Sequence, residues 1–353
     1  MQYAYKMMNR SKNMSDEVRT VGVLTSGGDS PGMNAAIRAV VRRGLSQGLK
    51  MKGIMKGYAG LINEDIKDMH AKDVCDIINR GGTILQTARC GEMMTTEGQE
   101  KAAAMCKKHG IDALIVIGGD GSYRGARALR DLGIKVIGIP GTIDRDIGLT
   151  KYTIGFDTAC NTAMEAIDRV RDTSASHERC SIIEVMGRGA GHIALWCGLA
   201  NGCEDIILPE KYDYNEQSII ENIIDNKRRG KKHHIIVNAE GIGHSGSMAK
   251  RIEQATGIET RATILGYMQR GGTPTIRDRV YAAIMGCLAI DCLVEGKNSR
   301  CICFNDGIFV DEDMDEVIAA ESHIDDYQFE IAKVLSHNYY KTEMDNLKDY
   351  LDC

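Results

Sequence analysis

The chain has 353 residues, of which 43% are hydrophobic and 26% charged, and its formal net charge is −5. At about 150 residues per domain, this length predicts two domains, each with enough apolar side chains for its own core. The weak negative charge excludes a nucleic-acid-binding protein that relies on an extended basic surface. No stretch approaches the roughly 18 uncharged apolar residues of a membrane span, so we expect no membrane insertion.

The cysteines and the first residues indicate a cytoplasmic protein. The 12 cysteines are scattered and form no C-x-x-C pair. We therefore expect reduced thiols instead of a disulfide framework, and no zinc site. Residues 1–17 are polar and Met-rich without an apolar signal-like segment, and we interpret them as a flexible tail.

Strand and helix patterns alternate along the chain. Val21–Thr25, Ile111–Ile117 and Ser181–Val185 are apolar runs that each lead into a glycine-rich turn and then a helical pattern. This alternation predicts an α/β fold with parallel sheets. Further expected elements are a helix over residues 71–79, a short strand ending at 89–91, a helix over 276–294 and a strand pair over 301–305 and 307–310.

Two glycine-rich turns are candidate phosphate sites. Ser26–Gly32 and Gly118–Ser122 each follow a strand and open a helix, where backbone N–H groups can bind an anion. Each could also be an ordinary strand-to-helix turn. Asp120 in the second turn would repel a phosphate unless a divalent cation lay between them, which indicates a Mg-nucleotide. The alternative is that Asp120 only caps the helix.

A third turn, Pro140–Asp146, combines a hydroxyl with two carboxylates. Thr142, Asp144 and Asp146 occupy alternate positions after the apolar run 136–139. In an extended segment this spacing points all three side chains the same way. The end of a sheet strand is a common place for a site in α/β proteins. The alternative is a structural turn, because Gly, Thr and Asp also favour turns.

These motifs together resemble the bacterial ATP-dependent 6-phosphofructokinase family from about residue 20 to 336. The matching segments are Leu24–Asp29, Gly118–Ser122, Pro140–Asp144, Glu184–Arg188 and Gln269–Gly272, in the order and spacing of that family. The resemblance implies an α/β fold of two Rossmann-like three-layer domains with mainly parallel sheets. We expect an N-terminal tail over 1–17, an ATP-binding domain over 18–154 and 268–318, a fructose 6-phosphate domain over 155–267 and 319–336, and a C-terminal extension over 337–353.

The resemblance implies a glycolytic kinase that transfers the γ-phosphoryl group of MgATP to the 1-hydroxyl of fructose 6-phosphate. In that family, the position of Asp144 is the general base, that of Thr142 holds the transferring phosphate and that of Arg89 stabilises transition-state charge. The implied Mg²⁺ ligand is Asp120. The implied ATP contacts are Gly28, Arg89, Cys90, Gly119, Asp120, Gly121, Ser122 and Gly125.

The same resemblance implies a sugar site that is completed by a neighbouring subunit of a homotetramer. Its implied contacts are Thr142, Asp144, Arg179, Met186, Gly187, Arg188, Glu240, Arg261, Tyr267 and Arg270. An effector site for ADP or phosphoenolpyruvate is implied at Arg38, Arg42, Arg171, Gly202, Glu204, Lys231, Lys232 and His233. Ala71 stands where an Arg of that site is usual, and Tyr267 stands where a phosphate-binding His is common.

The pyrophosphate-dependent branch of the family is the alternative function. It carries Asp at the position of Gly121 and Lys at that of Gly141, and small residues at both places leave room for ATP. Arg145 stands where Asn is usual, and a cation there would favour the ionised forms of Asp144 and Asp146. A lipid or dinucleotide kinase with the same glycine-rich turn would leave the arginines of the sugar site unexplained. A catalytically silent subunit would lack Asp120 or Asp144.

Overall fold

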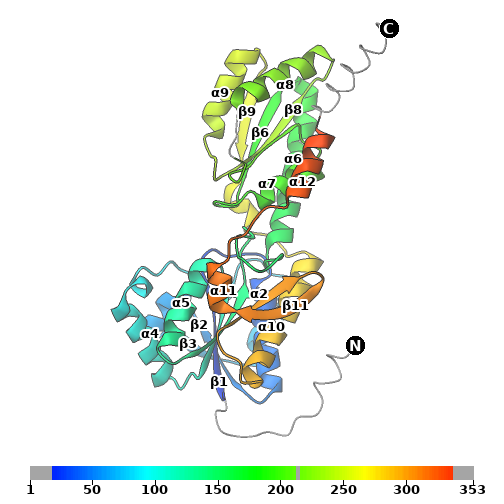
Figure 1. Ribbon diagram of the computed structural model, residues 1–353. Helices are drawn as coiled ribbons and strands as arrows, with labels where there is room; N and C mark the ends of the chain where they lie inside the picture. The colour runs from blue at the N-terminus through cyan, green and yellow to red at the C-terminus, as the bar shows by residue number, and fades with distance from the viewer. Residues whose placement is uncertain (1–17, 212–214, 337–353) are drawn as a thin grey trace.

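The chain folds into two α/β domains, as predicted. The computed structural model describes residues 18–211 and 215–336. One sheet has seven strands in the order β11-β10-β5-β4-β1-β2-β3, and the other has four in the order β7-β8-β6-β9. Figure 1 shows the domain with the larger sheet below and the domain with the smaller sheet above. Helix α6 (Phe156–His177) runs from the junction into the upper domain.

The larger sheet is parallel except at its two edges. Its strands are β1 (Thr20–Ser26), β2 (Lys50–Ile54), β3 (Ile66–Met69), β4 (Ala113–Gly118), β5 (Lys135–Pro140), β10 (Arg300–Asn305) and β11 (Ile308–Asp313). Only the β2–β3 and β10–β11 pairs are antiparallel. The predicted strand pair near residue 305 is therefore confirmed as a hairpin at one edge.

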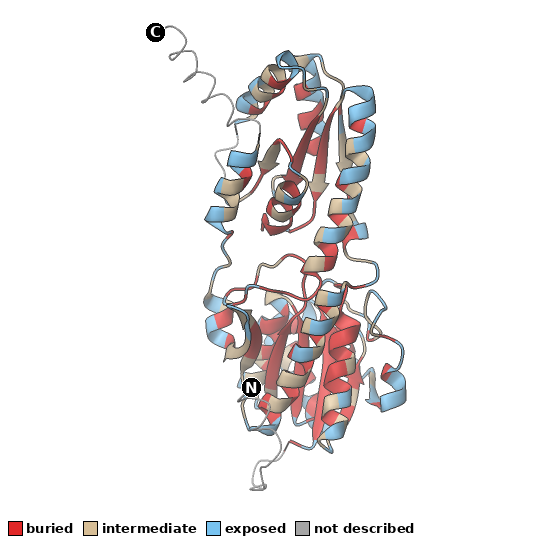
Figure 2. Cartoon of the chain, turned by 90° about the vertical axis from the view of Figure 1, so that its right-hand side faces the viewer, coloured by how far each residue is buried: buried red, intermediate tan, exposed pale blue. Residues whose placement is uncertain are grey.

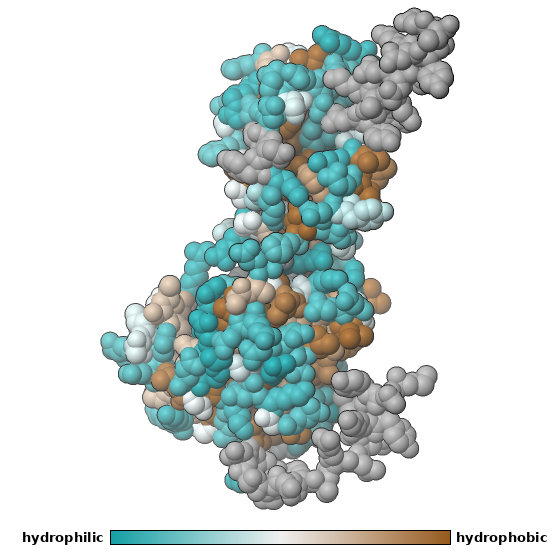
Figure 3. Space-filling model, viewed as in Figure 1, coloured by the Kyte–Doolittle hydropathy of each residue, from teal (hydrophilic) through white to brown (hydrophobic). Residues whose placement is uncertain are grey.

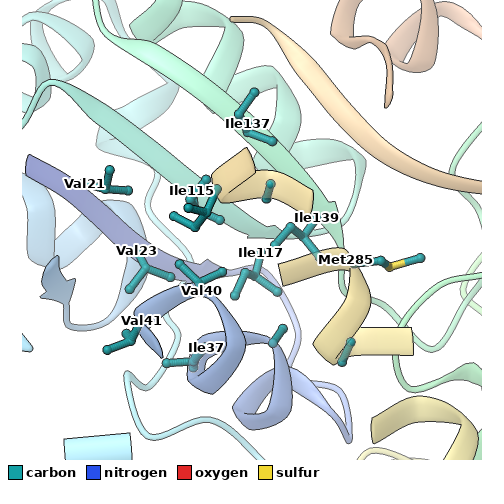
Figure 4. Packing of buried hydrophobic residues seen from close by; sticks show 14 of the residues in the cluster. Val21, Val23, Ile37, Val40, Val41, Ile115, Ile117, Ile137, Ile139 and Met285 are labelled. Carbon is teal, nitrogen blue, oxygen red and sulfur yellow. The ribbon is translucent and has the colours of Figure 1, made fainter. Parts of the chain in front are cut away.

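Helices cover both faces of this sheet. Side chains at alternate positions of β4 enter opposite cores, as the two-residue period of a strand requires. One face packs on α2 (Met33–Ser46) and α10 (Ile276–Val294), as Figure 4 shows for Ile37, Val40 and Met285. The other face packs on α3 (Gly57–Ile62), α4 (Thr96–Lys108), α5 (Asp120–Asp131) and α11 (Met314–Ala319).

The smaller sheet is parallel throughout. Its strands are β6 (Cys180–Val185), β7 (Asp205–Ile207), β8 (His234–Ala239) and β9 (Thr260–Ile264). Helices α6, α7 (His192–Ala200) and α12 (Asp326–Leu335) cover one face, and α8 (Glu216–Arg228) and α9 (Ser245–Thr256) cover the other. Buried strands lie between helices with exposed outer faces (Figure 2). None of the helices within the described ranges has the length and apolar composition needed to cross a bilayer.

Two expected elements are wrong. The helix predicted over 71–79 is only the 3₁₀ turn η1 (Ala71–Val74), and Asp76 beyond it has a left-handed backbone with φ of 54°. No strand ends at 89–91, where the described chain is a loop. Side chains hold this loop in place: the Thr25 hydroxyl donates to the Gln86 carbonyl at 2.8 Å, and the Thr87 hydroxyl donates to the Gly27 carbonyl at 2.7 Å. Two short 3₁₀ turns, η2 (Glu92–Met94) and η3 (Gly266–Gln269), complete the elements.

A buried carboxylate joins the domains at their junction. Asp278, near the start of α10, is 0% exposed. Its carboxylate accepts hydrogen bonds from the Tyr152 hydroxyl at 2.5 Å and the Gly155 N–H at 2.7 Å. It also accepts from the N–H of Thr158 at 2.9 Å and its hydroxyl at 2.5 Å. Burial raises the pKa of Asp278, and these hydrogen bonds oppose that rise. The start of α10 is thereby fixed to the start of α6.

We expect Asp278→Ala to lower the free energy of unfolding by about 3 kcal/mol or more, because it leaves several buried donors without an acceptor. Urea denaturation followed by circular dichroism measures this loss. Asp306→Asn, which removes only a surface ion pair with Lys151, serves as the control and should leave the midpoint unchanged. A loss below about 1 kcal/mol for Asp278→Ala would contradict its role in holding the junction.

Candidate active site

Three of the predicted motifs meet at the carboxyl ends of three central strands of the larger sheet, β1, β4 and β5. Strand β4 lies between β1 and β5 and is parallel to both, with Ser26 beside Gly118 and Gly118 beside Pro140. The segments that follow these strands therefore start side by side. They are the Gly27–Gly32 turn, the start of α5 and the turn formed by residues 141–146.

The residues Thr142 to Asp146, which we call the Thr142–Asp146 turn, are compact and not extended. The Asp144 N–H donates to the Thr142 hydroxyl at 3.2 Å, and Arg145 has a left-handed backbone with φ of 56°. The extended-segment argument for their common direction is therefore wrong. The two carboxylates still lie within electrostatic reach of each other: the charge of Asp146 raises the pKa of Asp144.

Asp144 has the environment of a general base. It is 6% exposed, and its Oδ1 atom has no hydrogen-bond partner among the described residues. Burial raises the pKa of Asp144 to about 6, with a further contribution from Asp146, while Arg270 opposes the rise. A carboxylate with this pKa is ionised at neutral pH and is a stronger base than an exposed aspartate. Its free oxygen is available to accept a proton from a substrate.

Arg145 does not favour the ionised aspartates as predicted. The central carbon of its guanidinium lies 5.2 Å from the centroid of the Phe156 ring and 5.5 Å from that of the Trp196 ring. Burial instead raises the pKa of Asp146, and the cations that oppose this rise are Arg188 and Arg270. The side chain of Arg145 is thus directed at the rings of α6 and α7 in the upper domain.

Asp120 lies at the start of α5 but does not cap it. Gly119 occupies the N-cap position, and the Asp120 carboxylate accepts a hydrogen bond from Arg124 Nε at 2.9 Å. The alternative interpretation of Asp120 as a helix cap is therefore excluded. Its charge raises the pKa of Asp146, so the two carboxylates are near enough to repel each other. Two nearby anions favour a cation between them and the phosphates of a ligand.

The predicted ATP contacts at positions 121, 122 and 125, near the start of α5, differ in their surroundings. A Cβ atom at Gly121 would meet nothing within 4 Å, so this position faces open space. The Ser122 hydroxyl instead donates to the Ser26 carbonyl at 3.0 Å and holds the two turns together. Gly125 packs against the Tyr58 ring, where a Cβ would lie 2.7 Å from a ring atom. Gly121 is thus open to a ligand, whereas Ser122 and Gly125 serve packing in this structure.

Arg270 lies directly against the Gly27–Gly32 turn. Its Nη1 atom donates to the Asp29 carbonyl at 3.2 Å, and a Cβ at Gly28 would lie 2.3 Å from that nitrogen. Glycine at position 28 is therefore required for this close approach. Arg89 is exposed and Cys90 half-buried on the neighbouring loop, which Thr25 and Thr87 hold against β1 and its turn.

The loop after β6 completes the site from the upper domain. The N–H groups of Gly187 and Arg188 donate to Glu240 Oε1 at 3.1 and 2.5 Å, and the Met186 N–H donates to Gln269 Oε1 at 2.8 Å. Gly187 has a φ of 148°, and a Cβ there would lie 2.3 Å from the Ala190 carbonyl oxygen. Glu240 also raises the pKa of Asp144, which places this loop within electrostatic reach of the Thr142–Asp146 turn.

Gln269 is a site residue that the sequence prediction missed. It is 0% exposed, and its Nε2 atom has no hydrogen-bond partner among the described residues. Gln269 lies on η3, directly before Arg270. Its side chain accepts the Met186 N–H and so positions the Met186 backbone. The available signal was its place in the Gln269–Gly272 motif beside a predicted substrate contact.

Two predicted phosphate contacts, Arg179 and Arg261, lie elsewhere on this chain, and a third, Tyr267, lies on η3 beside the site. Arg179 precedes β6, and its Nε donates to Glu259 at 2.6 Å; Arg261 Nε donates to the same carboxylate at 2.9 Å. Arg179 is thus at the opposite end of β6 from Met186, about 23 Å away at 3.3 Å per strand residue. Tyr267 is 83% exposed on η3. One chain alone therefore does not assemble the complete predicted phosphate clamp.

The predicted effector residues fall into two separate groups. Arg38 and Arg42 lie on α2 in the lower domain. In the upper domain, Arg171 donates to the Asn201 carbonyl at 2.6 Å and contacts His233 Nε2 at 3.5 Å. Close by, Lys231 pairs with Glu204, Lys232 pairs with Glu178 at 3.1 Å, and Gly202 follows α7. The two groups belong to different domains of the chain (Figure 1).

Comparison with known proteins identifies the family. The family model for phosphofructokinase matches residues 20–293. The chain belongs to the phosphofructokinase family. It is 53% identical over 320 residues to an ATP-dependent 6-phosphofructokinase of Clostridium novyi, covering 91% of this chain and 100% of that protein. A Clostridium botulinum protein with the same description is 54% identical over 319 residues, covering 90% of this chain and 100% of its own.

Solved phosphofructokinase structures share the fold. The phosphofructokinase of Saccharomyces cerevisiae superposes with a TM-score of 0.79 at 32% identity, over 90% of this chain and 46% of the yeast chain. This chain thus spans about half of that longer protein. A pyrophosphate-dependent phosphofructokinase of Marinobacter aquaeolei has a TM-score of 0.79 at 22% identity, over 88% of this chain and 86% of its own. That likeness concerns the fold alone.

Proposed function

We infer that this protein is an ATP-dependent 6-phosphofructokinase, a glycolytic enzyme of the cytoplasm. It transfers the γ-phosphoryl group of ATP to the 1-hydroxyl of fructose 6-phosphate and releases ADP and fructose 1,6-bisphosphate. The observation that carries the chemistry is the buried Asp144 carboxylate, with one free oxygen and a pKa raised to about 6, at the meeting point of the β1, β4 and β5 turns.

Asp144 is the proposed general base. Its free Oδ1 accepts the proton of the sugar 1-hydroxyl as that oxygen forms its bond to the γ-phosphorus. The bond from the γ-phosphorus to the bridging oxygen breaks, and that oxygen leaves with ADP. The Thr142 hydroxyl accepts the Asp144 N–H at 3.2 Å, so its own proton is free to donate to the transferring phosphate. Arg270 and the exposed Arg89 supply positive charge to the same space.

Mg²⁺ is the proposed cofactor, and Asp120 its protein ligand. The residues fit this ion because Mg²⁺ in kinases is held by one or two carboxylates together with substrate phosphates. When bound, it neutralises negative charge on the nucleotide phosphates. Within the described ranges, no cluster of three or more His, Cys, Asp or Glu side chains could hold a metal alone. The nucleotide phosphates would complete the ligand set.

Position 121 supports ATP as the phosphoryl donor. Gly121 faces open space, so a larger side chain there would project into the nucleotide region. Gly141 does not act in the same way: a Cβ there would lie 2.9 Å from Ile117 Cγ2 and 3.2 Å from Met33 Cε. The absence of a side chain at position 141 is therefore explained by core packing, and the room for ATP that we expected depends on Gly121.

A homotetramer is the proposed active form. Arg179 and Arg261 are distant from Met186 on the same chain, and a neighbouring subunit could bring its own pair to complete the sugar-phosphate site. An apolar surface is available for such contacts: Ile276 and Val280 on α10 are 81% and 46% exposed, and Met268 on η3 is 57% exposed. Figure 3 shows hydrophobic surface on the side of the lower domain that carries α10.

The same assembly would unite the proposed effector residues. Arg38 and Arg42 on α2 of one subunit could face the cluster of Arg171, Lys231 and His233 on another. An ADP or phosphoenolpyruvate molecule has the negative charge that these cations bind. Ala71 stands where the resemblance implies a further Arg, so this chain would hold the effector with one cation fewer.

A coupled assay with fructose 6-phosphate, comparing MgATP with Mg-pyrophosphate, tests the proposed function. We expect turnover with MgATP and none with pyrophosphate. Gly121→Asp should weaken ATP use selectively, because the added carboxylate enters the open space next to the nucleotide phosphates. Gly246→Asp, at an open and exposed position in the first turn of α9 in the upper domain, is the matched control. Turnover only with pyrophosphate would overturn the donor assignment.

The base is tested by Asp144→Asn and by the pH profile. We expect kcat to fall at least about 100-fold while fructose 6-phosphate still binds, because only the proton acceptor is lost. In the parent protein, kcat/KM should decline as pH falls through about 6, where Asp144 becomes protonated. Calorimetry measures the binding, and the coupled assay measures the rate. Unchanged turnover in Asp144→Asn would remove it as the base.

Asp146→Asn tests the electrostatic origin of the raised pKa. Because the charge of Asp146 raises the pKa of Asp144, its removal should shift the acid limb of kcat/KM to lower pH. Asp168→Asn, on the exposed side of α6, should leave the limb in place. A shift to higher pH in Asp146→Asn would show that Asp146 does not act on Asp144 by charge repulsion.

A further inference from the structure

We propose that Arg145 is a positioning residue that fixes the Thr142–Asp146 turn to helices α6 and α7 of the upper domain. The inference rests on the proposed function, because it takes Asp144 as the base that must be held in place. Arg145 is suited to this role by its position between the two aspartates, with its side chain directed away from both.

The guanidinium is held by two aromatic rings from different helices. It lies 5.2 Å from the centroid of Phe156, the first residue of α6, and 5.5 Å from that of Trp196 in α7. The rings meet edge to face, with centroids 5.3 Å apart and planes at 80°. A planar guanidinium can lie over both rings, whereas a compact ammonium is a poor substitute. One side chain of the turn thus contacts both helices.

The main chain of Arg145 is fixed by a second, independent contact. Its carbonyl accepts a hydrogen bond from the Ser322 hydroxyl at 3.0 Å, and the same hydroxyl oxygen lies 3.0 Å from His192 Nε2. Since Ser322 donates to Arg145, His192 must donate to Ser322 and carry its proton on Nε2. Burial and the charge of Arg145 lower the pKa of His192 to about 4, which keeps the ring neutral. His192 begins α7, so this chain of bonds ends on the same helix as Trp196.

The turn needs such an anchor because its backbone is unfavourable. Arg145 has a φ of 56°, a conformation that a residue with a Cβ keeps only when surrounding contacts hold it. The guanidinium has no ion pair or hydrogen bond with another described residue. Arg145 lines a pocket of about 210 Å³ together with His192 and Ser322. Contact with the rings, and not a carboxylate, therefore holds the side chain.

Loss of this anchor would move Asp144 without removing any substrate contact. We expect Arg145→Ala, which removes the guanidinium and keeps the Cβ atom, to lower kcat about 10- to 100-fold, the effect of a displacement of roughly 1 Å in a catalytic group. The KM values for fructose 6-phosphate and ATP should change little, because Arg270, Gly121 and the 186–188 loop stay in place. Arg145→Lys should recover only part of the rate, because an ammonium cannot cover both rings.

Trp196 gives a readout that does not depend on activity. It is the only tryptophan of the chain, so intrinsic fluorescence reports the surroundings of this ring alone. Arg145→Ala should shift its emission. Lys333→Ala is the matched control, because Lys333 lies over another ring, 4.5 Å from the centroid of Phe329, and is not part of the turn. It should retain the parent emission and turnover.

A double-mutant cycle decides between positioning and general stability. Trp196→Phe should keep turnover because a ring remains, and Trp196→Leu should lose turnover as Arg145→Ala does. The variant with both Arg145→Ala and Trp196→Leu should be no slower than the slower single variant. Losses that multiply, or parent-like kcat in Arg145→Ala, would overturn the proposal. If the parent protein shows no turnover, the proposed function is contradicted, and the fluorescence of Arg145→Ala still tests the contact.

Discussion

The arrangement of the site depends on the buried carboxylate of Asp278. It accepts hydrogen bonds from Tyr152, Gly155 and Thr158, and so fixes the chain that leaves the Thr142–Asp146 turn and enters α6. Phe156, held within this segment, then meets the guanidinium of Arg145. A carboxylate without these donors would be costly to bury. The two domains are thus joined through polar groups that are satisfied only when both are in place.

The chemistry depends on carboxylates that are kept together despite their repulsion. Asp144 is buried and Asp146 half-buried, and the charge of Asp120 also acts on Asp146. Arg188 and Arg270, one from each side of the site, offset this negative charge. The balance leaves Asp144 with a pKa of about 6, high enough for a useful base and low enough for ionisation at neutral pH. A substrate phosphate would then be attracted by Arg188 and Arg270, which already lie near the carboxylates of this site.

Sequence reasoning reached the fold and the centre of the site because both depend on local patterns. Apolar strands followed by glycine-rich turns identified the ends of β1, β4 and β5, and parallel pairing then brings these ends together. It failed where tertiary contacts decide the conformation. The direction of Arg145 is set by rings on α6 and α7. The loop at 80–91 is held by the Thr25 hydroxyl of β1 and by its own Thr87 hydroxyl, which donates to the Gly27 carbonyl. Neither contact leaves a periodic signal in the sequence.

Arg179 and Arg261 share one carboxylate in the single chain, and this has a consequence for ligand exchange. Glu259 is bound by both guanidinium groups, which lower its pKa. In the tetramer that we propose, Glu259 would occupy the place of the sugar phosphate until that ligand arrives. A phosphate ester carries more charge than Glu259 and would replace it as the partner of both arginines. The two cations would then pass from one anion to the other without standing unpaired, which would lower the barrier to sugar-phosphate entry and release.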